Sequence, residues 1–223
     1  MRLTKRIAAH LPERWQQELK RIHCRRRIAQ GAFEPSEPEY PLLPDWIRPG
    51  DWVIDVGANV GQYTLRFSEL AGPEGRVIAF EPVPETFALL SANTGHFPHA
   101  NVTLINAALS DRTGVAGISL SCFPTGLTDY YKARVSPVDG SARVVITLSF
   151  DSLGIEHPVG LVKIDVEGHE SAVLKGMVQL LRRDRPVLIV ETESDEVIAD
   201  LLAIGYAQER LPGSPNVLFR PRP

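Results

Sequence analysis

Acidic side chains lie at the ends of several short apolar runs in this chain. Asp55 lies in the run WVIDV, Glu81 follows RVIAF, and Asp165 and Glu167 lie in and after LVKIDV. Each run is rich in β-branched residues and short enough to be a buried strand of a parallel sheet. Ligands of open α/β sheets bind outside the carboxyl ends of the strands. We therefore expect these carboxylates to meet at one edge, where they suit a cationic ligand better than a diphosphate.

The turn after the first run is built around two glycines. Gly57 and Gly61 flank Ala58 and Asn59, so we expect backbone N–H groups to face the carboxyl edge of the sheet. This is not the dinucleotide fingerprint GxGxxG, because Asn59 stands where the second glycine would be. S-adenosylmethionine carries an ammonium and a sulfonium group, and Glu81 at the next strand end suits its two ribose hydroxyls. A nicotinamide cofactor, or a binding fold without activity, is the alternative.

A second group of residues could carry acid–base chemistry. Lys163 and Asp165 alternate with aliphatic residues, so both side chains point to one side of their strand. Buried charges must pair or face an open site. We expect Asp165 or Glu167 to take the proton of an alcohol, with Lys163 holding Asp165 or stabilising the alkoxide, and His169 as a second choice of base. Asp165, Glu167 and Glu191 are suitable ligand types for a divalent metal, but their spacing does not require one and we predict none.

Length and composition fit one ordinary α/β domain. The 223 residues are 43% hydrophobic and 23% charged, which is typical of a soluble protein. No apolar run approaches the roughly 20 residues that span a bilayer, and no secretion signal is recognisable. We therefore expect a cytoplasmic protein. Cys24 and Cys122 have no metal-ligand spacing, which argues against a zinc site or a disulfide framework.

The start of the chain is basic. Residues 1–27 contain nine Lys or Arg against two Glu, whereas the whole chain has a net charge of −3. Their apolar spacing predicts two short amphipathic helices divided at Pro12. Such an arm could cover the cofactor cleft as a lid, or make peripheral contact with an anionic membrane surface.

A proline-rich connector follows the arm. Residues 32–49 hold five prolines, which predicts an extended segment without regular structure. Glu37, Glu39 and Tyr40 could reach the cleft mouth, but we expect solvated side chains here. This pattern divides the chain into residues 1–49, the arm and connector, and residues 50–223, the S-adenosylmethionine-binding domain.

Strand and helix patterns alternate through the second part. Helices are expected over about 60–71, 84–97, 171–183 and 195–204, further strands over 101–107 and 185–191, and a hairpin around Gly213. Asn106 and Ala107 end the 101–107 strand at the same edge, as part of an adenine slot or as a plain turn. Two β segments within 110–150 are separated by a long loop over 121–141, in which Tyr130 and Tyr131 could form a substrate lid.

With these motifs placed, the chain resembles the FkbM family of S-adenosylmethionine-dependent methyltransferases. The matching segments are VIDVGANVGQYT (53–64), VIAFEPVPETF (77–87), INAALSD (105–111), LSFDSL (148–153), LVKIDVEGHE (161–170), VLKG (173–176) and VLIVE (187–191). Phe150 stands where the family tends to have leucine, a change that should affect packing only. The arm, the 121–141 loop and the last thirty residues lie outside the resemblance.

The resemblance implies a class I methyltransferase fold, a Rossmann-like, doubly wound α/β sheet of seven mostly parallel strands with an antiparallel last strand. It implies that the 55–61 turn holds the methionine part, Glu81 the ribose and Asn106 with its neighbours the adenine. The expected cofactor site consists of Asp55, Gly57, Ala58, Asn59, Gly61, Thr64, Glu81, Pro82, Asn106 and Ala107. The family's O-methyltransferases imply a hydroxyl acceptor on a sugar, polysaccharide or polyketide-type metabolite. We expect no nucleic acid partner, and a homodimer is possible.

Overall fold

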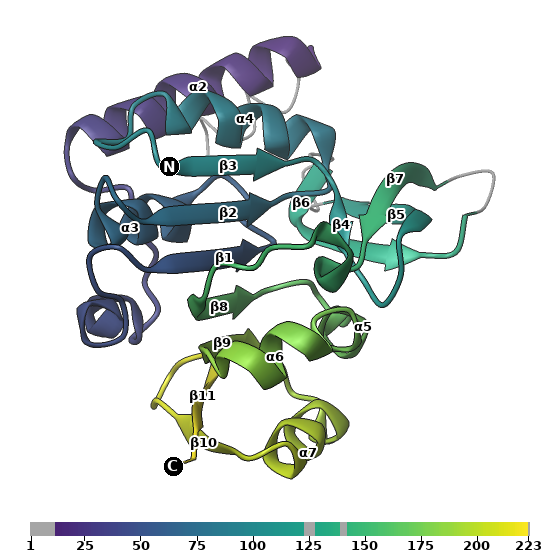
Figure 1. Cartoon of the computed structure of the whole chain (residues 1–223). Helices are drawn as coiled ribbons and strands as arrows, with labels where there is room; N and C mark the ends of the chain where they lie inside the picture. The colour runs from purple at the N-terminus through teal and green to yellow at the C-terminus, as the bar shows by residue number, and fades with distance from the viewer. Residues whose placement is uncertain (1–11, 123–127, 139–141, 223) are drawn as a thin grey trace.

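A seven-stranded sheet forms the centre of the protein (Figure 1). The computed structural model describes residues 12–122, 128–138 and 142–222. The strands lie in the order β10 (Tyr206–Arg210), β11 (Asn216–Pro221), β9 (Val187–Glu191), β8 (Val159–Ile164), β1 (Trp52–Val56), β2 (Arg76–Phe80) and β3 (Val102–Ile105). Neighbours are parallel except that β11 is antiparallel to both β9 and β10. The expected sheet with an antiparallel last strand is confirmed.

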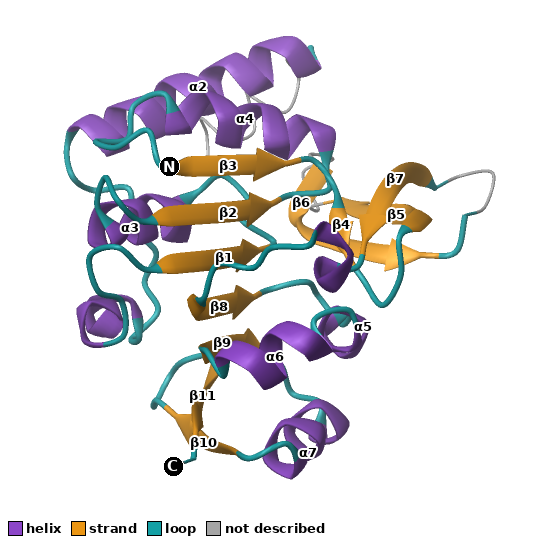
Figure 2. Cartoon of the chain, viewed as in Figure 1, coloured by secondary structure: helices purple, strands orange, loops and turns teal. Residues whose placement is uncertain are grey.

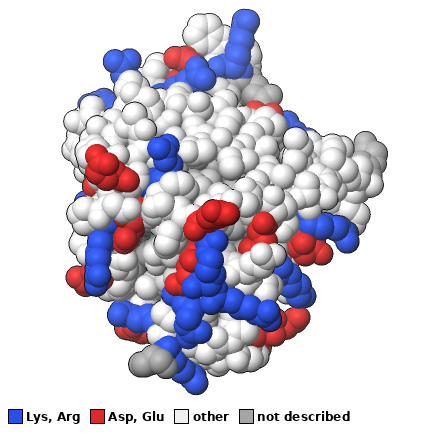
Figure 3. Space-filling model, viewed as in Figure 1, with Lys and Arg blue, Asp and Glu red and all other residues white. Residues whose placement is uncertain are grey.

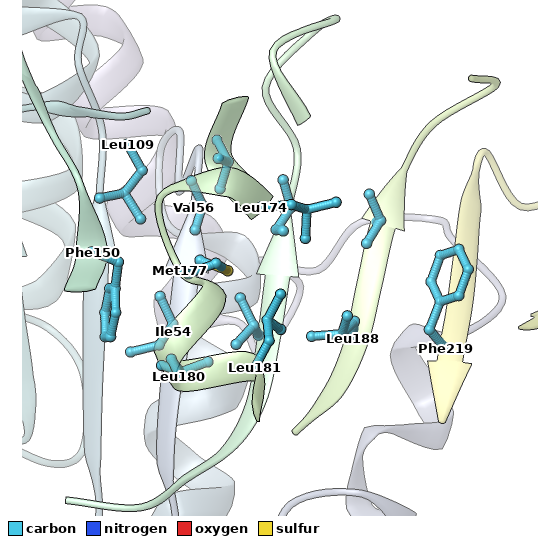
Figure 4. Packing of buried hydrophobic residues seen from close by; sticks show 14 of the residues in the cluster. Ile54, Val56, Leu109, Phe150, Leu174, Met177, Leu180, Leu181, Leu188 and Phe219 are labelled. Atoms are coloured by element: carbon cyan, nitrogen blue, oxygen red, sulfur yellow. The ribbon is translucent and has the colours of Figure 1, made fainter. Parts of the chain in front are cut away.

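Helices cover both faces of this sheet (Figure 2). They are α2 (Glu13–Ala29), α3 (Gln62–Ala71), α4 (Pro84–Thr94), α5 (Glu170–Lys175), α6 (Val178–Asp184) and α7 (Asp195–Ala203), with short 3-10 helices η1 (Tyr40–Asp45) and η2 (Phe150–Leu153). Alternate residues of β1 enter opposite cores, Ile54 with α5, α6 and α7 and Val53 with α3 and η1. Figure 4 shows the first of these cores. Because strand side chains alternate, β1 is buried on both faces, as its apolar pattern predicts.

The single helix expected over 171–183 is two helices. Gly176 and Met177 separate α5 from α6. A β-carbon on Gly176 would lie 1.9 Å from the carbonyl oxygen of Ser110, so this close approach admits only glycine. The backbone N–H groups of Gln179 and Leu180, in the first turn of α6, donate to the Asp151 carboxylate at 2.8 and 3.2 Å. The segments LSFDSL and VLKG therefore meet to build this break.

A second, smaller sheet stands at the carboxyl ends of the large one (Figure 1). Its order is β4 (Ala108–Leu109), β7 (Arg143–Leu148), β5 (Gly114–Cys122) and β6 (Thr128–Ser136). The expectation of an irregular loop over 121–141 is therefore wrong for 128–136, which pairs antiparallel with β5. Ala133 and Val135 of β6 pack with Ile118 of β5, and this burial outweighs the turn-forming residues around the strand. The side chains of Tyr130 and Tyr131 lie outside the described part of the chain.

The connector is more ordered than its prolines suggest. Residues 40–45 form η1, because the fixed φ of proline is compatible with a tight helical turn. Leu43 is fully buried and Tyr40 nearly so. Glu39, expected in solvent, is only 2% exposed and accepts hydrogen bonds from Tyr63 Oη (2.9 Å), Ser214 Oγ (2.7 Å) and Asn216 Nδ2. The prediction of solvated side chains is therefore wrong for Glu39 and Tyr40.

The arm is a single helix in its described part. Helix α2 begins directly after Pro12, and residues 1–11, where the other expected helix would fall, lie outside the described residues. Cys24 and Ile28 pack against Phe33 and Leu65, and α2 lies beside α4 (Figure 1). Among the described helices there is none whose length and apolar character would let it cross a membrane. A cytoplasmic location stays a prediction.

Candidate active site

A cavity of about 240 Å³ lies where the large sheet meets the small one. Its floor comes from the ends of β1, β2 and β8 and its roof from Ile118, Ala133 and Val135 of the small sheet. Five carboxylates reach it, from Glu37, Glu81, Asp165, Glu167 and Glu191. None of the described residues that line it is Lys or Arg. The site therefore favours a ligand with positive charge and hydroxyl donors over a diphosphate.

The glycine turn after β1 is fixed by the end of β8. Gly57 has φ +81°, and a β-carbon there would lie 1.9 Å from the carbonyl oxygen of Asp165. The N–H groups of Gly57 and Ala58 both donate to Phe80 O at 2.9 Å. The N–H of Asn59, whose φ is also positive, donates to Glu81. The N–H groups of residues 57–59, expected to face the carboxyl edge of the sheet, therefore donate to acceptors at the end of β2.

Glu81 stands at the end of β2 with its carboxylate in the cavity. It is 5% exposed, and its two oxygens accept from the backbone N–H groups of Asn59 (3.0 Å) and Val83 (2.9 Å). Burial raises the pKa of Glu81 to about 7, although these two hydrogen bonds act in the opposite direction. Each carboxylate oxygen can accept a further hydrogen bond. Glu81 is therefore held rigidly with capacity for two hydroxyl donors.

Lys163 is buried behind the cavity. Its ammonium group forms an ion pair with Asp165 and also interacts electrostatically with Asp55. Its Nζ lies 2.8 Å from Asp165 Oδ2 and 4.6 Å from the ring centroid of Tyr63. Burial lowers the pKa of Lys163, but Asp165 and then Asp55 outweigh it, and the net effect raises the pKa. Asp55 also accepts from Thr64 Oγ1 at 2.6 Å. The alternation of charged and aliphatic residues on this strand correctly placed Lys163 and Asp165 on one side.

Asp165 also approaches the end of β9. Burial, and after it the Asp165 carboxylate with its side-chain hydrogen bond, raises the pKa of Glu191 to about 7. The His169 ring lies nearby with Nε2 3.0 Å from Ser110 Oγ. Burial lowers the pKa of His169. A second cavity, of about 510 Å³, shares Glu167, His169 and Glu191 with the first.

The sequence-predicted residues divide into two groups. Those that line the cavity are Gly57, Asn59, Glu81, Pro82, Ala107, Asp165 and Glu167. Asp55, Ala58, Gly61, Thr64, Lys163 and Asn106 do not line it. Asp55 is 1% exposed and lies behind the turn with Thr64. Asn106 directs its amide nitrogen to the carbonyl oxygens of Glu81 (2.8 Å) and Pro82 (3.2 Å), and so braces the turn after β2.

Three contributions to the cavity differ from what the sequence predicted. Glu37, named as able to reach the cleft mouth but expected in solvent, lines the cavity from the connector, and its Oε2 is buried without a hydrogen-bond partner among the described residues. Glu191 was predicted to end its strand and was considered as a metal ligand, but not as part of the cavity lining. Ala133 and Val135 of the roof belong to β6, which the sequence pattern did not predict, whereas Ile118 belongs to a predicted β segment. In the described part of the chain, no three His, Cys, Asp or Glu side chains are grouped to hold a metal ion.

The fold is that of the class I methyltransferases. A crystal structure of methyltransferase FkbM from Methylobacillus flagellatus KT superposes with a TM-score of 0.54 at 15% identity, over 81% of this chain and 50% of that one. A putative rRNA methylase from Clostridium thermocellum gives 0.51 at 13% identity, over 81% and 90%. At such identities the likeness concerns the fold alone.

The chain belongs to the FkbM methyltransferase family, whose domain model matches residues 55–206. Hexuronic acid methyltransferase AglP of Haloferax volcanii is 32% identical over 151 residues, 66% of this chain and 59% of that protein. The 31-O-demethyl-FK506 methyltransferase FkbM of Streptomyces tacrolimicus is 46% identical over 69 residues, 31% and 26% of the two chains. This chain thus spans less than two thirds of either relative. S-adenosylmethionine is the cofactor of this methyltransferase family, and therefore of this chain.

Proposed function

We propose that this protein transfers a methyl group from S-adenosylmethionine to a hydroxyl of a sugar, polysaccharide or polyketide-type acceptor. The observation that carries the proposal is the cavity at the strand ends, which five carboxylates and none of the described Lys or Arg line. A sulfonium and an ammonium group suit this lining, and a nicotinamide dinucleotide does not. Membership of the FkbM family and the similarity to two relatives named for acting on a hexuronic acid and on a demethylated FK506 support it.

The buried oxygens of the cavity fit S-adenosylmethionine. Glu81 would accept hydrogen bonds from the two ribose hydroxyls, since each of its oxygens is already oriented by one backbone N–H. Glu37 Oε2 has no partner among the described residues and would accept from the ammonium group. Pro82 and Ala107 would contact the adenine, beside the side-chain oxygen of Asn106. In this arrangement Asp55, Thr64, Ala58 and Gly61 support the site from behind.

The chain's own part in the reaction is to position the acceptor and remove its proton. When bound, the cofactor supplies a methyl group already activated on sulfur. The residues shared by the two cavities would hold the acceptor oxygen in line with that methyl group, and such positioning is worth several kcal/mol. Asp165 would accept the proton of the acceptor hydroxyl. Lys163 fixes the orientation of the Asp165 carboxylate through its 2.8 Å contact.

Glu167 and Glu191 are the neighbouring carboxylates to which this proton can pass. The Asp165 carboxylate is near enough to Glu191 to raise the pKa of Glu191. His169 is a weaker candidate for the base, because its Nε2 is engaged with Ser110. We place the acceptor in the second cavity, where Glu167, His169 and Glu191 form the border with the cofactor.

Calorimetry with S-adenosylmethionine, its demethylated product and NAD tests the cofactor assignment. We expect the first two to bind and NAD not to bind. Glu81→Gln should weaken S-adenosylmethionine binding about 10- to 100-fold, because one charge-assisted hydrogen bond is lost. Glu69→Gln, on the exposed pair with Arg66, is the matched control and should bind normally. Tight NAD binding, or normal cofactor binding by Glu81→Gln, would overturn the assignment.

Turnover of S-adenosylmethionine with hydroxyl acceptors such as glucuronic acid and methyl glucoside tests the chemistry. Asp165→Asn should lower turnover about 10²- to 10⁴-fold and leave cofactor affinity within about tenfold, because a general base acts only on the proton transfer. Retained turnover would remove Asp165 from the mechanism. The same comparison with Glu167→Gln and His169→Gln assigns the base among the three candidates.

A further inference from the structure

Helix α2 carries an apolar face that the described chain does not cover. Trp15, Leu19 and Ile22 are spaced four and three residues apart, so they lie on one side of the helix. Their exposed fractions are 54%, 47% and 57%. We define these three residues, with Arg26 at the next position of the same side, as the outer face of α2. Exposed large apolar side chains gathered in one place indicate an interaction surface.

The opposite side of the helix already holds it to the protein. Cys24 is 8% exposed and, with Ile28, packs against Phe33 and Leu65. Arg27 donates to the carbonyl oxygens of Ala32 (2.7 Å) and Glu34 (3.0 Å), which fixes the end of the helix. The outer face is therefore not needed to hold α2 in place.

Positive charge accompanies the apolar side chains. Arg14, Glu18, Arg21 and Arg25 form the adjacent row of the helix, and all four are exposed. The helix contains six Lys or Arg against two Glu, in a chain whose overall net charge is −3. Figure 3 shows Lys and Arg side chains at the upper edge of the molecule, where α2 lies. An anionic surface therefore attracts this side of an otherwise acidic protein.

We propose that the outer face of α2 binds the surface of an anionic lipid bilayer, with the helix parallel to the membrane plane. Trp15, Leu19 and Ile22 would enter the boundary between headgroups and acyl chains, and the arginines would contact lipid phosphates. A second copy of this chain is a poorer occupant, because two such faces would bring like-charged arginine rows together. This activity goes beyond methyl transfer and needs neither cofactor nor acceptor.

Co-sedimentation of the full chain with lipid vesicles, in the absence of S-adenosylmethionine, tests the proposal. We expect binding to vesicles of phosphatidylcholine with phosphatidylglycerol, little binding to phosphatidylcholine alone, and weakening at high salt. Leu19→Ser combined with Ile22→Ser should lower the partition coefficient at least about tenfold. Arg21→Gln combined with Arg25→Gln should lower it about fivefold per arginine.

A matched control comes from the small sheet. Val144 and Ile146 are 58% and 55% exposed, so Val144→Ser combined with Ile146→Ser removes similar apolar area elsewhere and should leave partition unchanged. Circular dichroism and cofactor affinity confirm that each variant is folded. Three results would each overturn the proposal: no preference for anionic vesicles, wild-type partition by the Leu19/Ile22 variant, or a wild-type dimer in light scattering that this variant converts to a monomer.

Discussion

The carbonyl oxygen of Asp165 occupies the space that a β-carbon of residue 57 would need. The calculated separation of 1.9 Å and the φ of +81° at Gly57 act together, so the first glycine of the turn is required by the end of β8 as well as by its own backbone. The N–H of Asp165 in turn donates to Val56 O at 3.0 Å. The turn after β1 and the proposed base Asp165 therefore form one rigid unit. A shift of the turn would also move the base.

Gly57→Ala should force the turn after β1 away from Asp165 at the end of β8. We expect a loss of about 2 to 4 kcal/mol in the free energy of unfolding, from backbone strain and overpacking together. Gly154→Ala is the matched control, because Gly154 also has positive φ but a β-carbon there meets no atom within 4 Å. Chemical denaturation of both variants measures the two losses. The loss in Gly154→Ala reports backbone strain alone, and the excess in Gly57→Ala reports overpacking. Equal losses in the two proteins would contradict the close approach.

Lys163→Met should leave two carboxylates without their shared cation. The residue is buried beside Asp165 and Asp55, and breaking a buried ion pair costs about 3 to 5 kcal/mol. Because Asp55 is the more deeply buried of the two acids, the second substitution Asp55→Asn should restore part of the loss. Denaturation of both single variants and the double variant gives the coupling energy. Additive losses would show that Lys163 does not neutralise Asp55.

The pKa of Glu191 provides a test of its pairing with Asp165. Asp165→Asn should lower the pKa of Glu191 from about 7, because the charge that opposes its ionisation is removed while burial remains. Carbon NMR of labelled glutamate carboxyls, followed against pH, measures this directly. An unchanged midpoint for Glu191 would mean that burial alone sets its pKa.

The raised pKa values of Glu81 and Glu191 make the free energy of unfolding depend on pH. Glu191 and Glu81 titrate near 7 in the folded protein against an ordinary value of 4.5, so the folded state binds more protons between these values. The free energy of unfolding should therefore fall as the pH rises from about 4.5 to about 7. Glu191→Gln should make this fall shallower. Denaturation across that range checks the sign, and a rise with pH would refute it.

Asp151→Ala should destabilise the protein without touching the cavity. The carboxylate accepts from the N–H groups of Gln179 and Leu180 in the first turn of α6, and a lost helix cap costs about 0.5 to 2 kcal/mol. Cofactor affinity should remain normal, because the residue does not line the cavity. Thermal denaturation measures the loss of stability, and titration calorimetry with S-adenosylmethionine measures the cofactor affinity. A large drop in affinity would assign the FDSL segment a role in binding.

The sequence predicted the large sheet well because its strands have clear local sequence patterns. Short β-branched runs that end in Asp55, Glu81 and Asp165 leave few alternatives to a parallel sheet with a polar edge. The period-two pattern of this strand also predicts that Lys163 and Asp165 lie on the same side. These are local signals, and local periodicity is what a single sequence carries.

Long-range contacts account for what the sequence did not predict. Glu39 looks solvated among prolines, and only its meeting with Tyr63, Ser214 and Asn216 explains its burial. Likewise, no local pattern indicates β6, whose Val135 pairs with Ile118 of the predicted segment β5. The turn at residues 57–59 lies at the predicted strand end, but only the structure shows that Phe80 and Glu81 accept its N–H groups.

The small sheet and the large sheet contribute different parts of the cavity. It is one continuous insertion, residues 108–148, between β3 and β8, and it contributes aliphatic side chains from Ile118 and Val135 to the cavity. The groups proposed for chemistry, Glu81 and Asp165, belong to the large sheet. Substitutions in the small sheet can therefore reshape the cavity roof without displacing the carboxylates of Glu81 and Asp165.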